Sequence, residues 1–108
     1  MTREYGKVQE LNIISEGLTF IDSGNPYLKA FTSLKKLDLS FNRLNRLEHL
    51  DCLPSLRDLN LSYNRLTCLE NLTKLPSLRV LVLDHNKLPR LEGLKALKKL
   101  EVLSVTGN

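Results

Sequence analysis

The sequence of 108 residues has few of the residue types that mark several protein classes. It contains no tryptophan, two cysteines, five glycines and four prolines, and aromatic residues make up 6% of the chain. Two cysteines are too few for a disulfide-rich secreted scaffold. No apolar run approaches the roughly 18 residues of a membrane-spanning helix, and the first residues lack the apolar segment of a secretory signal. We therefore expect an intracellular protein with no membrane partner, in the cytoplasm, with the cytoskeleton, the cilium and the nucleus as alternative locations.

The charge balance excludes a polybasic arm for nucleic acid. Lys and Arg number 16 against 12 Asp and Glu, a formal charge of +4 that no segment concentrates. The glycines are scattered, so no glycine-rich phosphate loop is present. With 42% hydrophobic residues the chain is long enough for one core. These features predict a single domain over residues 1–108.

An internal repeat of 22 residues organises this domain. Leucine recurs at residues 34, 56, 78 and 100, and asparagine follows each of these four leucines eight residues later. The predicted units are 8–33, 34–55, 56–77, 78–99 and a partial 100–108. The first is four residues longer, and the extra residues fall in 22–27, where Gly, Asn and Pro indicate a turn that bulges from the surface.

Within each unit the spacing of apolar residues changes once, from every second residue to every third. Around Leu37 and Leu39 the alternation has period two, which predicts a short strand that buries both leucines. After Asn42 the leucines recur every third residue, which favours a 3₁₀ or short helical return on the opposite face. Because one unit cannot bury its own leucines, neighbouring units must stack. The asparagine is expected to satisfy backbone donors and acceptors between coils.

The frame LxxLxLxxNxL, read from Leu34 to Leu44, resembles the leucine-rich repeat over about residues 8–108. Its 22-residue length is similar to that of the Sds22-like subfamily. The resemblance implies an α/β solenoid with a short parallel sheet on the concave face and 3₁₀ or short helical returns on the convex face. It also implies a non-enzymatic, regulatory or scaffolding module, with phosphatase, tubulin, centrosomal or ciliary dynein components as conceivable partners.

Two departures from the repeat concern its ends. Glu16 stands where the first unit should carry asparagine, as is usual in a terminal unit, and no C-terminal cap follows Asn108. Repeat arrays need polar caps for solubility, so we expect either that the chain is an excised piece of a longer array or that its open end pairs with another copy.

The predicted binding surface follows from stacking the units, because residues 22 apart then lie about 4.8 Å from one another. The outward-facing residues of the strands change from polar to apolar along the solenoid. Just beyond the strands, one repeat position carries a ring side chain in three successive units. Rings and exposed valines are typical of interaction surfaces. Alternatively, the rings only pack on each other and stabilise the fold. The protein-binding residues that we predict are Lys36, Asp38, Phe41, Asp58, Asn60, Tyr63, Val80, Val82 and His85.

Catalysis and metal binding find little support in the sequence. His85 follows Asp84, but adjacent residues of a strand point in different directions and no serine nucleophile accompanies them. Cys52 and Cys68 fall at different repeat positions, so we expect free thiols, and with the two histidines they lack zinc-ligand spacing. We expect no enzyme activity, no cofactor and no metal.

An RNA–protein particle is the alternative function, since some similar repeat proteins belong to such particles. The basic residues expected on the turns and the convex side are Arg43, Arg46, Arg65, Lys87, Arg90, Lys95, Lys98 and Lys99. Glutamates are interspersed with them, and mixed charge is more typical of a solvated face. Nucleic acid is therefore the less favoured partner. Binding through these residues would weaken steeply with salt.

Overall fold

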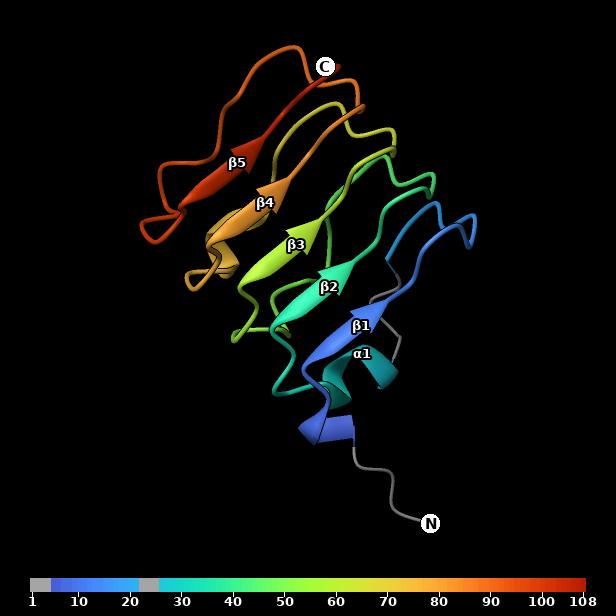
Figure 1. Cartoon of the computed structure of the whole chain (residues 1–108), viewed down its shortest axis with the longest axis vertical. Helices are drawn as coiled ribbons and strands as arrows, with labels where there is room; N and C mark the ends of the chain where they lie inside the picture. The colour runs from blue at the N-terminus through green and yellow to red at the C-terminus, as the bar shows by residue number, and fades with distance from the viewer. Residues whose placement is uncertain (1–4, 22–25) are drawn as a thin grey trace.

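The computed structural model describes residues 5–21 and 26–108, which form one row of stacked coils (Figure 1). Five short parallel strands make a single sheet in sequence order, so each coil lies beside its neighbour in the chain. The strands are β1 (Glu10–Asn12), β2 (Lys36–Asp38), β3 (Asp58–Asn60), β4 (Val80–Val82) and β5 (Val102–Ser104). This arrangement confirms the predicted parallel-sheet solenoid.

The strand register follows the sequence repeat. Leu37 pairs with Leu59, and Leu59 with Leu81, each 22 residues further along the chain. Leu11 pairs with Leu37, so the first coil is longer by four residues, as predicted. Residues 22–25 of the predicted bulge lie outside the described residues, and helix α1 (Pro26–Ala30) begins directly after them.

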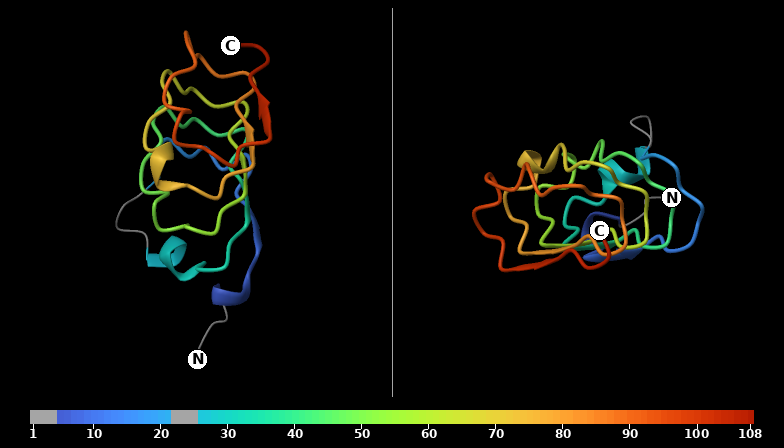
Figure 2. Two further views of the ribbon diagram at one scale, coloured as in Figure 1. Left: turned by 90° about the vertical axis from the view of Figure 1, so that its left-hand side faces the viewer. Right: turned by 90° about the horizontal axis from the view of Figure 1, so that it is seen from above.

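The returns run on the side opposite the sheet (Figure 2). Two of them hold a helix, α1 and the 3₁₀ helix η2 (Leu72–Lys74), and a further 3₁₀ helix, η1 (Tyr5–Lys7), precedes β1. In the coil of residues 34–55, isolated turns replace the predicted helix. There the Leu53 and Leu56 amides donate to carbonyls three residues back, at 3.0 and 3.1 Å. Single turns of this kind suffice to place a leucine inside at every third residue.

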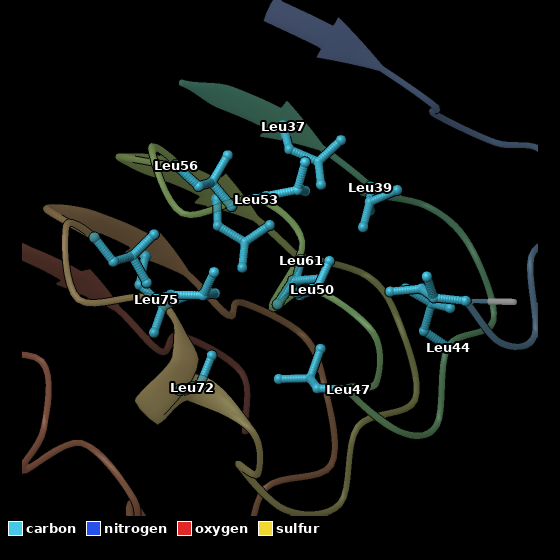
Figure 3. Packing of buried hydrophobic residues seen from close by; sticks show 14 of the residues in the cluster. Leu37, Leu39, Leu44, Leu47, Leu50, Leu53, Leu56, Leu61, Leu72 and Leu75 are labelled. Carbon is cyan, nitrogen blue, oxygen red and sulfur yellow. The ribbon is translucent and has the colours of Figure 1, made fainter. Parts of the chain in front are cut away.

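The leucines fill the space between sheet and returns (Figure 3). Leu34, Leu56 and Leu78 are completely buried, and so are their counterparts in the turns, Leu44 and Leu66. Each fully buried leucine side chain stabilises the fold by about 1.5 to 3 kcal/mol relative to its exposure. Because one coil cannot bury its leucines alone, the stacking of neighbouring coils holds the backbone of the sheet in place.

The repeated asparagines join coil to coil. Asn64 Nδ2 donates to the carbonyls of Leu39 and Leu61, both at 3.0 Å, and its Oδ1 accepts from the Leu44 amide at 2.9 Å. Asn86 repeats all three bonds one coil further on. Within the described residues no buried side-chain nitrogen or oxygen lacks a partner. The role predicted for the asparagine column is therefore confirmed.

Candidate functional site

The sheet presents a shallow hollow of about 250 Å³ on its outer face. Outward-facing side chains of four strands line it, and six of the nine predicted site residues meet there: Lys36, Asp38, Asp58, Asn60, Val80 and Val82. The β2 end is polar, and Lys36 Nζ lies 3.7 Å from Glu10 Oε1 across the first pair of strands. The β4 end is apolar, because both outward residues are valines. The structure thus brings the predicted concave residues together.

Two residues of this hollow also serve the turn that follows their strand. Asp38 Oδ1 accepts from the Ser40 amide at 2.9 Å, and Asn60 Oδ1 accepts from the Ser62 amide at 3.0 Å and from Ser62 Oγ at 2.7 Å. Our sequence analysis assigned both residues to binding alone. The signal that it missed is an Asp or Asn followed two residues later by a serine, the spacing of a side-chain-stabilised turn.

The other three predicted residues form a separate feature at the edge of the sheet, which we call the ring ladder: Phe41, Tyr63 and His85. The Phe41 and Tyr63 rings stack with centroids 4.4 Å apart and planes 8° apart, and Tyr63 and His85 stack at 4.4 Å and 20°. Phe41 remains 51% exposed and Tyr63 45% exposed. The packing between rings that the structural alternative requires is present, and so is the exposure that binding requires.

All three ladder residues have left-handed backbone. Their φ angles are 58° at Phe41, 55° at Tyr63 and 56° at His85, and Gly107, next in the column, has 74°. Such a conformation costs a residue with a side chain about 1 to 2 kcal/mol. Stacking of an aromatic pair stabilises the fold by about 0.5 to 1.5 kcal/mol, which only offsets this cost. The ladder therefore adds little net stability. Sequence analysis missed this strain, although Gly107 in the column was a signal of it.

Asp84 is engaged away from His85. Its Oδ1 accepts from Ser104 Oγ at 2.6 Å and from the Thr106 amide at 2.8 Å, both on the next coil. The carboxylate therefore joins two coils, and the arrangement of a histidine oriented by a carboxylate is not formed here.

Both cysteines are free thiols. Cys68 is exposed, while Cys52 is half-buried and its Sγ donates to the His49 carbonyl at 3.4 Å. Burial raises the pKa of the Cys52 thiol. Within residues 5–21 and 26–108, no three His, Cys, Asp or Glu residues gather closely enough to hold a metal ion. No helix in that part of the chain is long and apolar enough to cross a bilayer.

Part of the predicted basic surface is neutralised. Arg46 Nε lies 3.2 Å from both Glu48 Oε1 and Glu70 Oε1, and Arg90 Nη1 lies 3.3 Å from Glu92 Oε1. The hydrogen bond to Glu70 and the nearby negative charges raise the pKa of Arg46. These exposed ion pairs stabilise the fold little, but they lower the local positive potential.

The last coil exposes part of its apolar framework. Leu103 is 38% exposed, and Leu100 and Val105 are half-buried. End-to-end pairing of two copies through these residues stays a prediction.

The stacked parallel coils, three of which carry a buried asparagine at the same repeat position, define a solenoid repeat protein. Residues 6–66 match the family profile described as "Leucine rich repeat", and residues 54–96 match "Leucine Rich repeats (2 copies)". Because the first match covers more than half of the chain, the protein belongs to the leucine-rich repeat family. Neither match assigns the narrower Sds22-like subfamily, and no curated protein matches the sequence.

Solved structures with the same fold come from Listeria monocytogenes. The functional domain of InlJ, described as including a cysteine ladder, is 25% identical, with a TM-score of 0.74 over 93% of this chain and 20% of its own. The internalin InlF is 23% identical, with a TM-score of 0.76 over 91% of this chain and 28% of its own. Internalin C2 is 22% identical, with a TM-score of 0.72 over 92% and 52%. The chain thus spans between a fifth and about half of these proteins.

Proposed function

We propose that this protein is a non-enzymatic interaction module that binds a partner protein in the hollow of its sheet. Leucine-rich repeat domains generally mediate protein–protein interaction. The observation that carries the proposal is the 250 Å³ hollow, in which charged and apolar side chains stand on one fixed sheet. We further propose that the protein acts inside the cell, as a regulatory or scaffolding subunit.

The mechanism is rigid presentation of the sheet face. Buried leucines and the asparagine column fix the backbone of the strands, so docking of a partner orders little additional chain. Lys36 and Asp58 give the hollow charges of both signs, which select orientation and register. Val80 and Val82 supply apolar area that a partner removes from water.

The alternative role in an RNA–protein particle is less well supported. The convex Arg46 and Arg90 both lie beside glutamates, which reduce the attraction of that face for phosphate. Among protein partners, the resemblance to Sds22-like proteins makes phosphatase, tubulin, centrosomal or dynein components reasonable candidates for a first screen.

A pull-down from cell lysate tests the sheet face. Asp58→Lys/Val80→Lys replaces two outward residues of the hollow with long side chains whose charged ends reach water. Asp51→Lys/Leu91→Lys changes the charge by the same amount at exposed residues outside the hollow. Once circular dichroism shows that both are folded, mass spectrometry should find partners lost only with the Asp58/Val80 variant. Identical partner sets for both variants would overturn the proposal.

A further inference from the structure

Three exposed cations accompany the ring ladder. Arg43, Arg65 and Lys87 each follow a ladder residue by two positions, and the asparagine between ring and cation is buried. We call these three residues the cation column. Its backbone stacks coil on coil like the ladder does, since the Arg65 amide donates to the Leu44 carbonyl at 2.8 Å and the Lys87 amide to the Leu66 carbonyl at 2.9 Å. Rings and cations therefore stand side by side on one edge, with one of each in the three coils that begin at Leu34, Leu56 and Leu78.

The cation column carries uncompensated charge. In the part of the chain that the structure describes, no carboxylate lies within 4.0 Å of Arg43, Arg65 or Lys87. By contrast, Arg46 lies 3.2 Å from Glu70, and Arg79 Nη2 lies 2.9 Å from Glu101 Oε1. The edge beside the ring ladder thus keeps a row of positive charge that a negatively charged ligand can complement.

The ring ladder stabilises this edge little, because ring stacking is offset by strained backbone. Gly107 occupies the same column at φ 74°, where glycine adopts the left-handed backbone without strain. Phe41, Tyr63 and His85 adopt it with bulky side chains that stay exposed. Strained backbone of this kind is concentrated at binding sites, where it holds a side chain in a fixed place.

We propose that this edge binds an acidic segment of the partner protein, in extended conformation, running along the solenoid axis. The two steps from Arg43 to Lys87 cover about 10 Å, the length of about three residues of extended peptide. Successive side chains of such a peptide point to opposite sides, so a chain lying over the buried asparagines would direct carboxylates to the cation column and apolar groups to the rings. This rests on the proposed function and names the chemistry of its partner.

Fluorescence anisotropy with a defined probe tests the assignment. The probe is a fluorescein-labelled peptide of about eight residues in which glutamate and leucine alternate. At low salt it should bind the natural protein, and Arg43→Gln/Arg65→Gln/Lys87→Gln should weaken binding about fivefold or more. Phe41→Asn/Tyr63→Asn should also weaken it, because asparagine tolerates the left-handed backbone but offers no ring.

The matched control removes three other cations. Arg57→Gln/Lys98→Gln/Lys99→Gln has the same formal charge as the first variant, but its changes lie around a different hollow, of about 430 Å³. It should bind the probe within about twofold of the natural protein. Equal losses in both triple variants, or no binding of the probe, would overturn the proposal. Tighter binding of a single-stranded oligonucleotide through the cation column would overturn it in favour of nucleic acid.

The two proposals can fail separately. If Asp58→Lys/Val80→Lys loses its partners while the probe does not bind, the sheet face stands and the acidic segment is wrong. If the probe requires the cation column but the Asp58/Val80 variant keeps every partner, the edge stands and the hollow is wrong.

Discussion

The imidazole of His85 lies directly on the backbone of Gly107, one coil further along. A Cβ built on Gly107 would stand 2.5 Å from His85 Nδ1 and 2.8 Å from its Cε1. The ring ladder therefore ends on a glycine, and the missing side chain makes room for the last ring. This contact links a feature of the backbone to the geometry of the proposed binding edge.

Gly107→Ala is expected to displace the His85 ring. The added methyl group cannot share the space of the imidazole, and at φ 74° alanine also strains the backbone. The His85 ring signals in NMR spectra should shift strongly. Gly17→Ala is the control, because its φ is 69° but nothing lies within 4 Å of the added Cβ. Unchanged His85 signals in Gly107→Ala would show that the contact is not formed in solution.

Replacement of Tyr63 should separate backbone strain from ring contacts. Tyr63→Ala loses the stacking with both neighbours but keeps the cost of φ 55°, whereas Tyr63→Gly loses the stacking and relieves the strain. We expect Tyr63→Gly to be more stable than Tyr63→Ala by about 1 kcal/mol in thermal or urea unfolding. The opposite order would show that position 63 is not left-handed in solution.

Leu59→Ala provides the reference for that series. Leu59 is 1% exposed, and its truncation should cost about 2 to 5 kcal/mol and unfold a large fraction of so small a solenoid. Both Tyr63 variants should stay folded by circular dichroism. If Tyr63→Ala is as unstable as Leu59→Ala, the ring ladder is structural and its assignment to binding is wrong.

Asn64→Ala should be strongly destabilising although it removes no apolar contact area. The buried amide of Leu44 would lose its acceptor, at a cost of about 1 to 3 kcal/mol for an unsatisfied group, and the carbonyl of Leu39 would keep only the donor from Asn42. Urea unfolding measures the change. Asn45→Ala, at an exposed position, is the control and should stay within about 0.5 kcal/mol of the natural protein. Similar stabilities of the two variants would contradict the role of the asparagine column.

Thiol labelling should distinguish the two cysteines. Burial raises the pKa of Cys52, so at neutral pH a smaller fraction of it is the reactive thiolate, whereas Cys68 is exposed. With limiting iodoacetamide, peptide mass spectrometry should find Cys68 modified first. In guanidinium chloride, where burial is lost, the two rates should converge. Preferential modification of Cys52 in the folded protein would contradict this environment.

The periodicity of the sequence alone determined the architecture. Leucine at 22-residue intervals, with a change of period after each asparagine, leaves one arrangement that buries most of the leucines, and the strand register from Leu37 to Leu81 follows it. The role of Asn64 was equally predictable, because a buried turn needs an amide that both donates and accepts. The outward positions of the strands placed Lys36 and Val80 on one face.

Only the tertiary structure decided how the surface groups are used. Whether Arg46 is paired and Arg43 is not depends on which glutamates the stacking of coils brings within reach, and repeat spacing does not contain this information. The same holds for Asp84, whose carboxylate accepts from Ser104 and Thr106 of the next coil. The left-handed backbone under Phe41 and Tyr63 is imposed by the tight turn between strand and asparagine. The sequence states the type of each side chain, but the partners of Arg46 and Asp84 belong to the neighbouring coil, and only the stacked structure brings them within reach.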